Sequence, residues 1–253
     1  MENNAVKKDN RKALPKFLLI LLGAALFGGV LGFFAGWMGY SSVSDAVREV
    51  LDHIVSRFLP WAIPAVCLAL LAESWRRYRK ARELFEGWDG SNEEPLETAD
   101  RILNWSLLWS SLAMVLNLFS ISISSYCTLP GSPLIVTVLF LLILVLTMLL
   151  QQKVVDLTRQ INPEKQGSIY DTKFQKKWFE SCDEAEKAQI GQAAYKAYNA
   201  TAKTAIVLWV ALVVLDFIFG FGPLPAFTVL LVWGVAQTAY ILECIRLEKG
   251  GSR

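Results

Sequence analysis

The sequence predicts an all-α, polytopic membrane protein in which six transmembrane helices form three hairpins with helical cytoplasmic connections. Two observations predict this fold. Of the 253 residues, 54% are hydrophobic, and the mean hydropathy is +0.38. The apolar residues form long uncharged runs instead of the periodic stripe of a soluble amphipathic helix. We therefore expect a single integral membrane domain over residues 1–253.

The composition argues against three other classes of protein. A hydrophobic content of 54% is too high for a disordered chain. The four cysteines are scattered and do not form the framework of a small disulfide-rich secreted protein. The net charge of +2 is too balanced for a chain that binds nucleic acid mainly through its charge.

Six apolar runs have the length of a membrane-spanning helix, which needs roughly 20 residues to cross a hydrocarbon core of about 30 Å. They cover residues 17–38, 54–72, 105–124, 134–150, 204–220 and 224–242. Arg57 lies near one end of the second run and Asp216 lies within the fifth, whereas the other four carry no charge. Strands with open edges would leave backbone polar groups unsatisfied in lipid, so the runs are predicted to be helices.

The basic residues predict the orientation of these spans. The segments assigned to the cytoplasm are residues 1–16, 73–103, 151–203 and 243–253, and they contain every Lys and Arg except Arg48 and Arg57. Lys and Arg next to membrane spans are retained on the cytoplasmic side. An even number of spans also places both termini on one side. The sequence therefore predicts a multi-pass plasma-membrane protein with both termini in the cytoplasm.

The connections between the spans also have predicted structure. The first outer tip, residues 40–58, has helical spacing of its apolar residues and is expected to lie along the membrane interface and turn inward at Pro60 and Pro64. The other two outer tips are short Gly/Pro turns. On the cytoplasmic side, helix breaks are expected at residues 88–92 and 162–167.

New helices are expected to begin after both cytoplasmic breaks. The first should begin near Pro95 and the second after Asp171. Ser181 and Glu184 have the spacing of a capping box, which predicts a kink or a further helix start at that point.

The second cytoplasmic segment carries a resemblance to a known family. Its residues are Asn-Pro-Glu-Lys-Gln-Gly-Ser-Ile-Tyr-Asp at 162–171, Lys-Phe-Gln-Lys-Lys-Trp at 173–178, Ser-Cys-Asp-Glu-Ala-Glu at 181–186 and Ala-Ala-Tyr-Lys-Ala-Tyr at 193–198. Together they resemble a family of uncharacterised multi-pass membrane proteins of Gram-positive bacteria, classed as a domain of unknown function. The similar hydropathy layout covers nearly the whole chain. The resemblance implies a bacterial plasma membrane and no particular reaction.

Asp216 is the strongest candidate for a functional residue within a span. A carboxylate at the centre of a membrane helix costs about 2.5–3.5 kcal/mol on insertion scales, and such groups normally have a partner. Asn117 lies at a similar depth, and Arg57 enters from the same outer edge. We expect Asp216 to face the bundle interior and meet one or both of them. The alternatives are a structural ion pair, an interfacial carboxylate, or a group that couples to protons or cations.

Two patterns of small or polar residues are expected to mark helix contacts. Gly28, Gly32 and Gly36 recur every four residues, which lets another helix of the chain or a second subunit approach closely. Ser110, Asn117 and Ser124 recur every seven residues and share one helix face. That polar face is explained by hydrogen bonds between helices or, alternatively, by a polar pathway.

The cytoplasmic segment between Asp171 and Lys203 is rich in aromatic residues interleaved with lysines: Phe174, Trp178, Phe179, Tyr195 and Tyr198. Phe174, Trp178 and Phe179 are the candidate docking residues. Two interpretations remain open. The segment is a helical cap packed on the membrane face, or it is a docking site for a partner protein. Neighbouring acidic residues argue against binding of nucleic acid.

The residue inventory lacks the constellations of common catalytic and metal sites. With His53 as the one histidine, neither a Ser-His-Asp triad nor a His-Glu-x-x-His zinc site is present. The sequence also has no Cys-x-x-Cys pair and no P-loop lysine motif. We therefore expect no enzymatic activity, no metal and no cofactor.

These observations lead to two hypotheses about function. The first is a non-enzymatic accessory or regulatory membrane protein that contacts the bilayer and a membrane or cytoplasmic protein, or a second copy of itself. The second is a small secondary transporter or permease subunit that uses Asp216 within the bundle. The concentration of distinctive residues in 162–198 favours the first.

Overall fold

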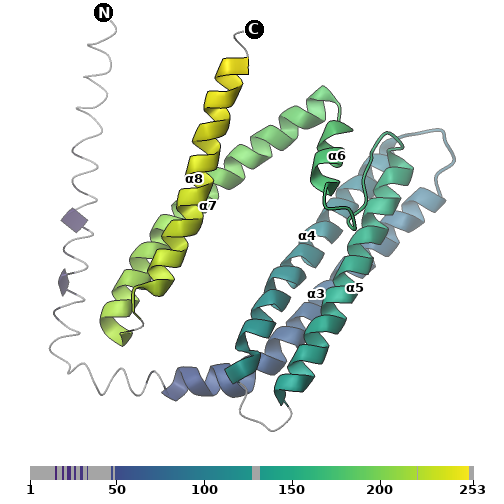
Figure 1. Cartoon of the computed structure of the whole chain (residues 1–253). Coiled ribbons are helices and arrows are strands. Elements are labelled where there is room, and N and C mark those ends of the chain that lie inside the picture. The colour runs from purple at the N-terminus through teal and green to yellow at the C-terminus, as the bar shows by residue number, and fades with distance from the viewer. Residues whose placement is uncertain are drawn as a thin grey trace, which may run out of the picture. The chain divides into compact units, whose positions relative to one another are not determined.

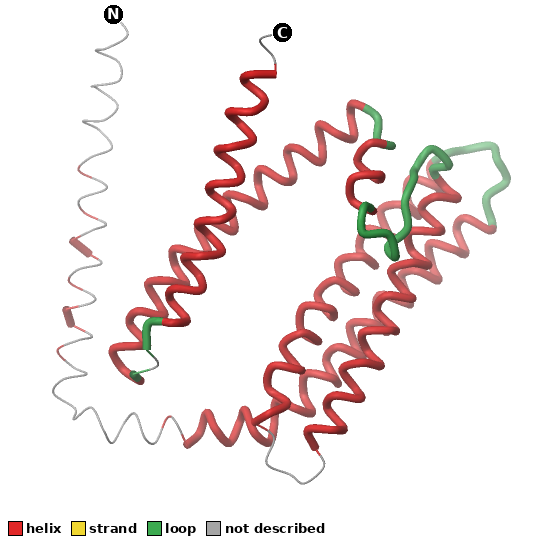
Figure 2. The backbone as a smooth tube through the Cα atoms, viewed as in Figure 1, coloured by secondary structure: helices red, strands yellow, loops and turns green. Residues whose placement is uncertain are grey.

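The computed structural model describes residues 49–126, 132–220 and 222–250, together with isolated positions at 15, 19, 22–23, 26, 29–30, 33 and 47. Its helices are η1 (Ile54–Phe58), α3 (Leu59–Glu86), α4 (Glu94–Ile123), η2 (Ser124–Tyr126), α5 (Ser132–Ile161), α6 (Phe174–Glu180), α7 (Glu184–Phe219) and α8 (Leu224–Gly250). No strand occurs in the described residues (Figure 2). The all-α prediction is therefore confirmed for this part of the chain.

Five helical stretches among the described residues are long and apolar enough to cross a membrane. They are Glu49–Glu86, Glu94–Ile123, Pro133–Ile161, Glu184–Asp216 and Leu224–Leu247. They overlap the second to sixth predicted spans and extend beyond most of them. The first predicted span, residues 17–38, falls largely outside the described residues, and Gly28, Gly32 and Gly36 fall entirely outside them.

The chain forms two compact units, residues 49–191 and residues 1–48 with 192–253. In the first unit, α3, α4 and α5 form a three-helix bundle in which α4 runs antiparallel to both α3 and α5 (Figure 1). Buried positions recur every three or four residues along α4: Ala99, Leu103, Ser106, Ser110, Ala113, Asn117 and Ser120. This is the spacing of one helix face, and its small side chains allow close helix packing.

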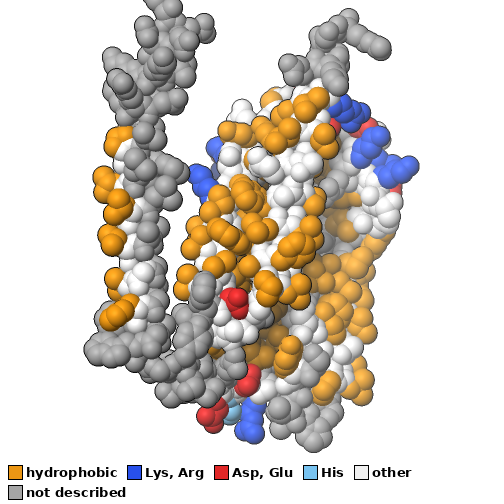
Figure 3. All heavy atoms as spheres, turned by 60° about the vertical axis from the view of Figure 1, so that its left-hand side comes forward, with side chains coloured by type: hydrophobic (Ala, Val, Ile, Leu, Met, Phe, Trp, Pro, Cys, Tyr) orange, Lys and Arg blue, Asp and Glu red, His pale blue; other side chains and the backbone are white. Residues whose placement is uncertain are grey.

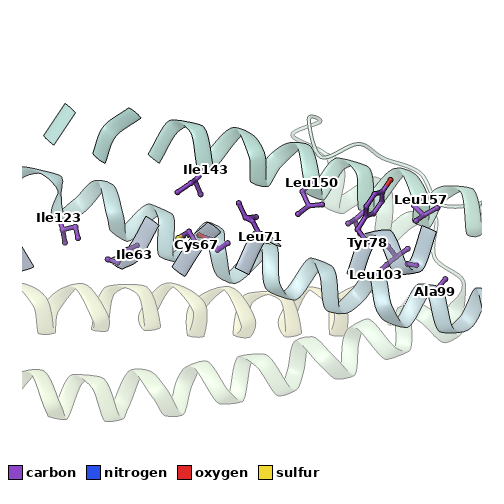
Figure 4. Close-up of a cluster of buried hydrophobic side chains, with 13 residues drawn as sticks. Ile63, Cys67, Leu71, Tyr78, Ala99, Leu103, Ile123, Ile143, Leu150 and Leu157 are labelled. Atoms are coloured by element: carbon purple, nitrogen blue, oxygen red, sulfur yellow. Dashed lines mark hydrogen bonds between the residues drawn. The ribbon is translucent and has the colours of Figure 1, made fainter. Parts of the chain in front are cut away.

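Apolar side chains from all three helices meet in the centre of this bundle. Ile63, Leu71 and Tyr78 come from α3, Leu103 from α4 and Ile143 from α5 (Figure 4). The outer faces of the helices are apolar as well, and charged side chains gather mainly toward the helix ends (Figure 3). An apolar outer surface over the length of five helices is suited to lipid and not to water.

Ser74 of α3 and Ser106 of α4 join the two helices through a reciprocal pair of hydrogen bonds. The Ser74 hydroxyl donates to the carbonyl oxygen of Ser106 at 2.7 Å, and the Ser106 hydroxyl donates to that of Ser74 at 2.9 Å. Both side chains are fully buried. Each hydroxyl therefore has an acceptor where water has no access.

Replacing Ser106 should distinguish close packing from hydrogen bonding. Ser106→Ala removes one hydrogen bond and should lower the free energy of unfolding by about 1 kcal/mol. Ser106→Leu adds bulk where the two backbones approach closely and should cost more, about 2–3 kcal/mol. Thermal unfolding of the purified protein in detergent measures both. Equal midpoints for the two variants would contradict close packing at this position.

The two predicted cytoplasmic breaks lie at the same end of the bundle (Figure 2). α3 ends at Glu86 and α4 begins at Glu94, with Pro95 in its first turn. α5 ends at Ile161 and the next helix begins at Phe174. Both breaks and both restarts are therefore where the sequence predicts them.

The prolines at the start of α3 do not end the helix. Pro60 lies in its first turn and Pro64 lies inside it. The preceding five residues form the π-helix η1, and the chain changes direction there (Figure 1). A π-helical turn and a proline are both recognised causes of a helix bend.

In the second unit, α7 and α8 form an antiparallel hairpin. The Tyr198 ring stacks on the Tyr240 ring with centroids 4.7 Å apart, and its hydroxyl is hydrogen-bonded to Gln237. Gly220 and Gly222 in the tip have φ angles of 64° and 81°. Glycine adopts these left-handed conformations readily, so the two residues permit the tight reversal.

Candidate functional site

The connection between α5 and α7, residues 162–183, is the candidate site, and we call it the cap. It folds onto the ends of α4 and α5 and includes the short helix α6. The Gln166 amide N–H donates to the Ser181 hydroxyl oxygen at 3.1 Å and so joins the loop to the end of α6. The cap therefore closes on itself instead of running as an extended linker.

Gln152 of α5 fastens the cap to the bundle. Its side-chain oxygen accepts hydrogen bonds from the Ile169 amide at 3.0 Å and from the Ser168 hydroxyl at 3.1 Å. Its amide nitrogen donates to Asp156 at 2.7 Å. All the polar atoms of this side chain therefore have partners, which orients it toward the loop.

Lys165 is the buried charge of the cap, because its side chain is only 4% exposed. Its ammonium group forms an ion pair with Glu186 and donates to the Cys182 sulfur at 3.4 Å. Asp100 of α4 is close enough to interact electrostatically with both Lys165 and Glu186. One side chain therefore connects the loop, the start of α7 and the end of the bundle.

The electrostatic environment keeps Lys165 charged. Burial alone lowers the pKa of a lysine, but the hydrogen bonds to Glu186 and Cys182 outweigh it and raise the pKa above its ordinary value. The stabilisation by this pair is therefore fully present below the pKa of an unfolded lysine. It is lost only as the pH rises through the raised value.

The capping box at the start of α7 is formed by residues other than the predicted pair. The Asp183 carboxylate accepts from the Glu186 amide at 2.7 Å, and the Glu186 carboxylate accepts from the Asp183 amide at 3.1 Å. The helix start is near the predicted place, but Ser181 instead accepts from Gln166 and donates to the Trp178 carbonyl. The Glu186 carboxylate therefore both caps the start of α7 and pairs with Lys165.

The cap and the bundle together line an open pocket of about 730 Å³. Its wall includes Leu107 of α4, Val155 of α5 and all three predicted docking residues, Phe174, Trp178 and Phe179. Phe174 and Trp178 are half-buried, with ring centroids 5.6 Å apart, whereas Phe179 is 44% exposed. Phe179 is therefore the most accessible of the three.

Asp171 and Lys177 form an exposed ion pair, 2.5 Å between Oδ2 and Nζ, beside α6. Hydrogen bonds from the Lys177 side chain and the Lys173 amide lower the pKa of Asp171 below its ordinary value of 3.8. The stabilisation of α6 by Asp171 is therefore complete above the ordinary value. It disappears as the pH falls through the lowered pKa.

A pH series should detect this contribution. Hydrogen exchange in residues 174–180, corrected for intrinsic rates, is expected to accelerate as the pH falls below the ordinary aspartate value. Asp171→Asn should exchange faster at neutral pH and lose this additional acceleration. An unchanged pH profile in Asp171→Asn would show that Asp171 does not contribute to the stability of α6.

Two residues of the predicted intramembrane polar site, Asp216 and Asn117, have hydrogen-bond partners near them in the chain or in the bundle. Asp216 of α7 accepts a hydrogen bond from the Gly222 amide at 2.6 Å. Asn117 of α4 donates to the Phe140 carbonyl of α5 at 3.0 Å, while its own side-chain oxygen is buried without a partner among the described residues. Arg57 lies exposed on η1. The predicted meeting of Asp216 with Asn117 or Arg57 stays a prediction.

Substitutions of Asp216 can separate a structural role from a role in ion coupling. Asp216→Asn keeps an oxygen that can accept from Gly222, so the unfolding midpoint should stay near that of the wild type. Asp216→Leu removes the acceptor and should lower the free energy of unfolding by about 1 kcal/mol. Thermal unfolding in detergent measures both variants. An Asp216→Asn variant with a wild-type midpoint but an abolished cellular phenotype would favour coupling over structure.

Two residues of the predicted polar face of α4, Ser110 and Asn117, are fully buried, and Ser124 is half-buried. Ser110 donates to the Leu107 carbonyl at 3.0 Å, and the Gln151 amide donates to Ser110 at 3.4 Å. Ser124 follows the end of α4, in η2, and donates to the Ile121 carbonyl. Hydrogen bonding within and between helices therefore involves all three residues of this face.

Sequence reasoning missed Lys165 and Gln152, which position the cap. Lysines are common in cytoplasmic loops, and no periodicity shows which of them is buried. Among the described residues, no group of three or more His, Cys, Asp or Glu side chains is placed to hold a metal ion.

Comparison with known proteins identifies one family. A family model described as a protein of unknown function (DUF3169) matches residues 11–243. No curated protein and no solved structure matches the chain. The matched region includes the cap, four of the five described candidate spans and the fifth span up to residue 243.

Proposed function

The chain belongs to this family of proteins of unknown function (DUF3169), and from that premise we propose that it is a regulatory or accessory protein of the plasma membrane. It crosses the bilayer six times in three hairpins, has both termini in the cytoplasm and catalyses no reaction. It acts by binding a partner protein through the cap.

The distribution of charge supports this orientation. Both helix breaks of the bundle lie at one end, and the flanking helix ends carry most of its basic residues. Basic residues next to spans favour the cytoplasmic side. The cap is then accessible to cytoplasmic proteins.

The main observation behind the proposal is that the cap has a defined structure, held by an ion pair between the buried Lys165 and Glu186. A linker between two spans needs no buried lysine, and burying a charge is unfavourable unless the group is paired. Lys165 is held by Glu186 and Cys182, and Gln152 holds the loop at a second point. These contacts fix a surface on which Phe179 is exposed at 44%. Exposed aromatic side chains are frequent anchors of protein interfaces.

Co-purification after mild detergent extraction tests the proposal. Phe179→Ser should reduce the yield of the bound partner, because it removes an exposed aromatic side chain and keeps the contacts of Lys165 with Glu186 and Cys182. The matched control is Tyr170→Ser in the same cap, where the side chain is 58% exposed but does not line the pocket. Absence of any partner from the wild type, with an unchanged phenotype in Phe179→Ser, would contradict the proposal.

A further inference from the structure

Two exposed tryptophans mark one level of the three-helix bundle. Trp75 of α3 is 41% exposed and Trp105 of α4 is 48% exposed. They lie at the same level, because the adjacent residues Ser74 and Ser106 are hydrogen-bonded to each other, with hydroxyl oxygens 2.9 Å apart. Trp75 also contacts α5, since the Lys153 ammonium lies 5.1 Å from the centre of its ring. All three helices therefore contribute to this level.

The charge of the bundle changes at the same level. On one side, none of the three helices has an Asp, Glu, Lys or Arg over residues 59–72, 106–123 and 132–152. On the other side, charges begin within about one helical turn, at Glu73, Arg101 and Lys153. The Glu73 carboxylate is paired with Arg76 and Arg77. The uncharged side suits hydrocarbon, and the charged side suits water.

An aromatic residue also marks the far end of the uncharged part of α4. Tyr126 in η2 is 64% exposed and follows Trp105 by 21 residues. This separation is about 31 Å of helix at about 1.5 Å per residue, and the hydrocarbon core of a bilayer is about 30 Å thick. Large exposed side chains between the two are apolar, among them Leu108, Leu112 and Val115. Tryptophan and tyrosine are enriched at both surfaces of a membrane, so this spacing fits a bilayer.

We propose that Trp75, Trp105, Lys153 and Arg77 bind the headgroup layer of the membrane and set the depth of the bundle in it. We call these four residues the belt. The indole rings lie between hydrocarbon and headgroups, and the two cations reach the phosphates. Arg77 lies over the Trp105 ring, 5.6 Å from its centre, as Lys153 lies over Trp75. The belt is covered by lipid and not by a protein, because the uncharged surface of all three helices begins there.

The belt places the ends of α3 and α4 outside the membrane. α3 continues for 11 residues from Trp75 to Glu86, which is about 16 Å of helix. α4 begins at Glu94, 11 residues before Trp105. Both ends then stand in water, where ion pairs such as that of Arg82 with Glu86 are exposed. The inference rests on the part of the proposed function that places the chain in a bilayer, and not on its orientation or on a partner of the cap.

Nitroxide accessibility in phosphatidylglycerol-containing liposomes tests the position of the boundary. Spin labels are attached to Arg101→Cys or Leu108→Cys, which are exposed positions on either side of Trp105, in the full-length protein. The exposed Cys244 and the native Cys127 are first replaced with serine. The label at 108 should collide mainly with oxygen, which concentrates in hydrocarbon, and the label at 101 mainly with a water-soluble nickel chelate. The same preference at both positions would place the boundary elsewhere and overturn the proposal.

Removing the indoles tests whether the belt sets this depth. Trp75→Ala/Trp105→Ala should shift both labels in the same direction relative to the membrane surface, by about one helical turn or about 5 Å. Trp88→Ala is the matched control, because Trp88 is 37% exposed in the loop between α3 and α4, away from the belt. Unchanged depths in the double variant, or an equal shift in Trp88→Ala, would show that the two tryptophans do not anchor the bundle. Thermal midpoints measured in parallel distinguish a shift in depth from unfolding, and the boundary between positions 101 and 108 is measured without these variants.

Discussion

Among single substitutions of Lys165, Glu186 and Cys182, Glu186→Gln is expected to open the cap most. The variant leaves a buried ammonium without its carboxylate, and an inadequately compensated buried charge is strongly unfavourable. Glutamine still supplies an oxygen for the capping box with Asp183, so the start of α7 is retained. We expect the free energy of cap opening to fall by about 2 kcal/mol, a change of about thirtyfold in the opening equilibrium.

The labelling rate of Cys182 by a maleimide measures this opening. The Cys182 side chain is only 6% exposed and contacts Lys165, so it reacts only when the cap opens. The exposed Cys244 and the native Cys127 are first replaced with serine to leave a simple background. The thermal midpoint of the whole protein, measured in parallel, distinguishes local opening from global unfolding.

Lys165→Met provides the matched control. Methionine has a similar length and no charge, while Glu186, with 36% of its side chain exposed, can be hydrated after the lysine is lost. The effect should be below about 1 kcal/mol, and the double variant Lys165→Met/Glu186→Gln should resemble Lys165→Met alone. If Cys182 were labelled as fast in the double variant as in Glu186→Gln, the unpaired ammonium of Lys165 would not be the cause of the opening.

Gly167→Ala should have an effect at least as large as that of Glu186→Gln, and it acts on the same cap. Gly167 has a φ angle of 125°, which L side chains rarely adopt, and a Cβ atom there would lie 2.8 Å from Cδ2 of Phe174. The backbone strain and the steric conflict should together cost about 2–3 kcal/mol. Faster labelling of Cys182 and a lower thermal midpoint are the expected results.

Gly191→Ala is the control for this substitution. Gly191 lies in α7, and apart from its chain neighbours and the backbone of its own helix nothing in the described residues lies within 4 Å of the position its Cβ would take. Alanine in a helix is favoured over glycine by about 0.5–1 kcal/mol, so this variant should be slightly more stable than the wild type. A small gain in stability for Gly167→Ala as well would contradict the positive φ angle and the close approach of Phe174 at Gly167.

The large features of the fold could be predicted because each depends on local composition. Apolar runs of helical length locate the five described spans, and the Gly/Pro-containing breaks after α3 and α5 locate the loops. The spacing of Ser110 and Asn117 indicates a shared face, and both residues are buried. Helix period and turn chemistry are short-range properties that a single sequence contains.

The parts that were missed depend on tertiary contacts. Ser181 and Glu184 match the pattern of a capping box, but Asp183 and Glu186 match it as well. The structure has the second pair, in which Glu186 also forms the ion pair with Lys165. The hydrogen bond from the Gly222 amide to Asp216 was not anticipated either, while the expected contacts of Asp216 with Asn117 and Arg57 stay predictions. Neither the burial of a loop lysine nor a backbone donor can be read from residue type alone.

Cysteine accessibility in intact cells tests the central claim that the cap and the loop after α3 face the cytoplasm. Glu93→Cys and Glu164→Cys are made one at a time after Cys67, Cys182 and Cys244 have been replaced, with Cys127 retained as the outer reference. Both glutamates are exposed. The account predicts that a membrane-impermeant maleimide labels Cys127 in intact cells and labels positions 93 and 164 only after permeabilisation. Labelling of either position in intact cells would contradict it.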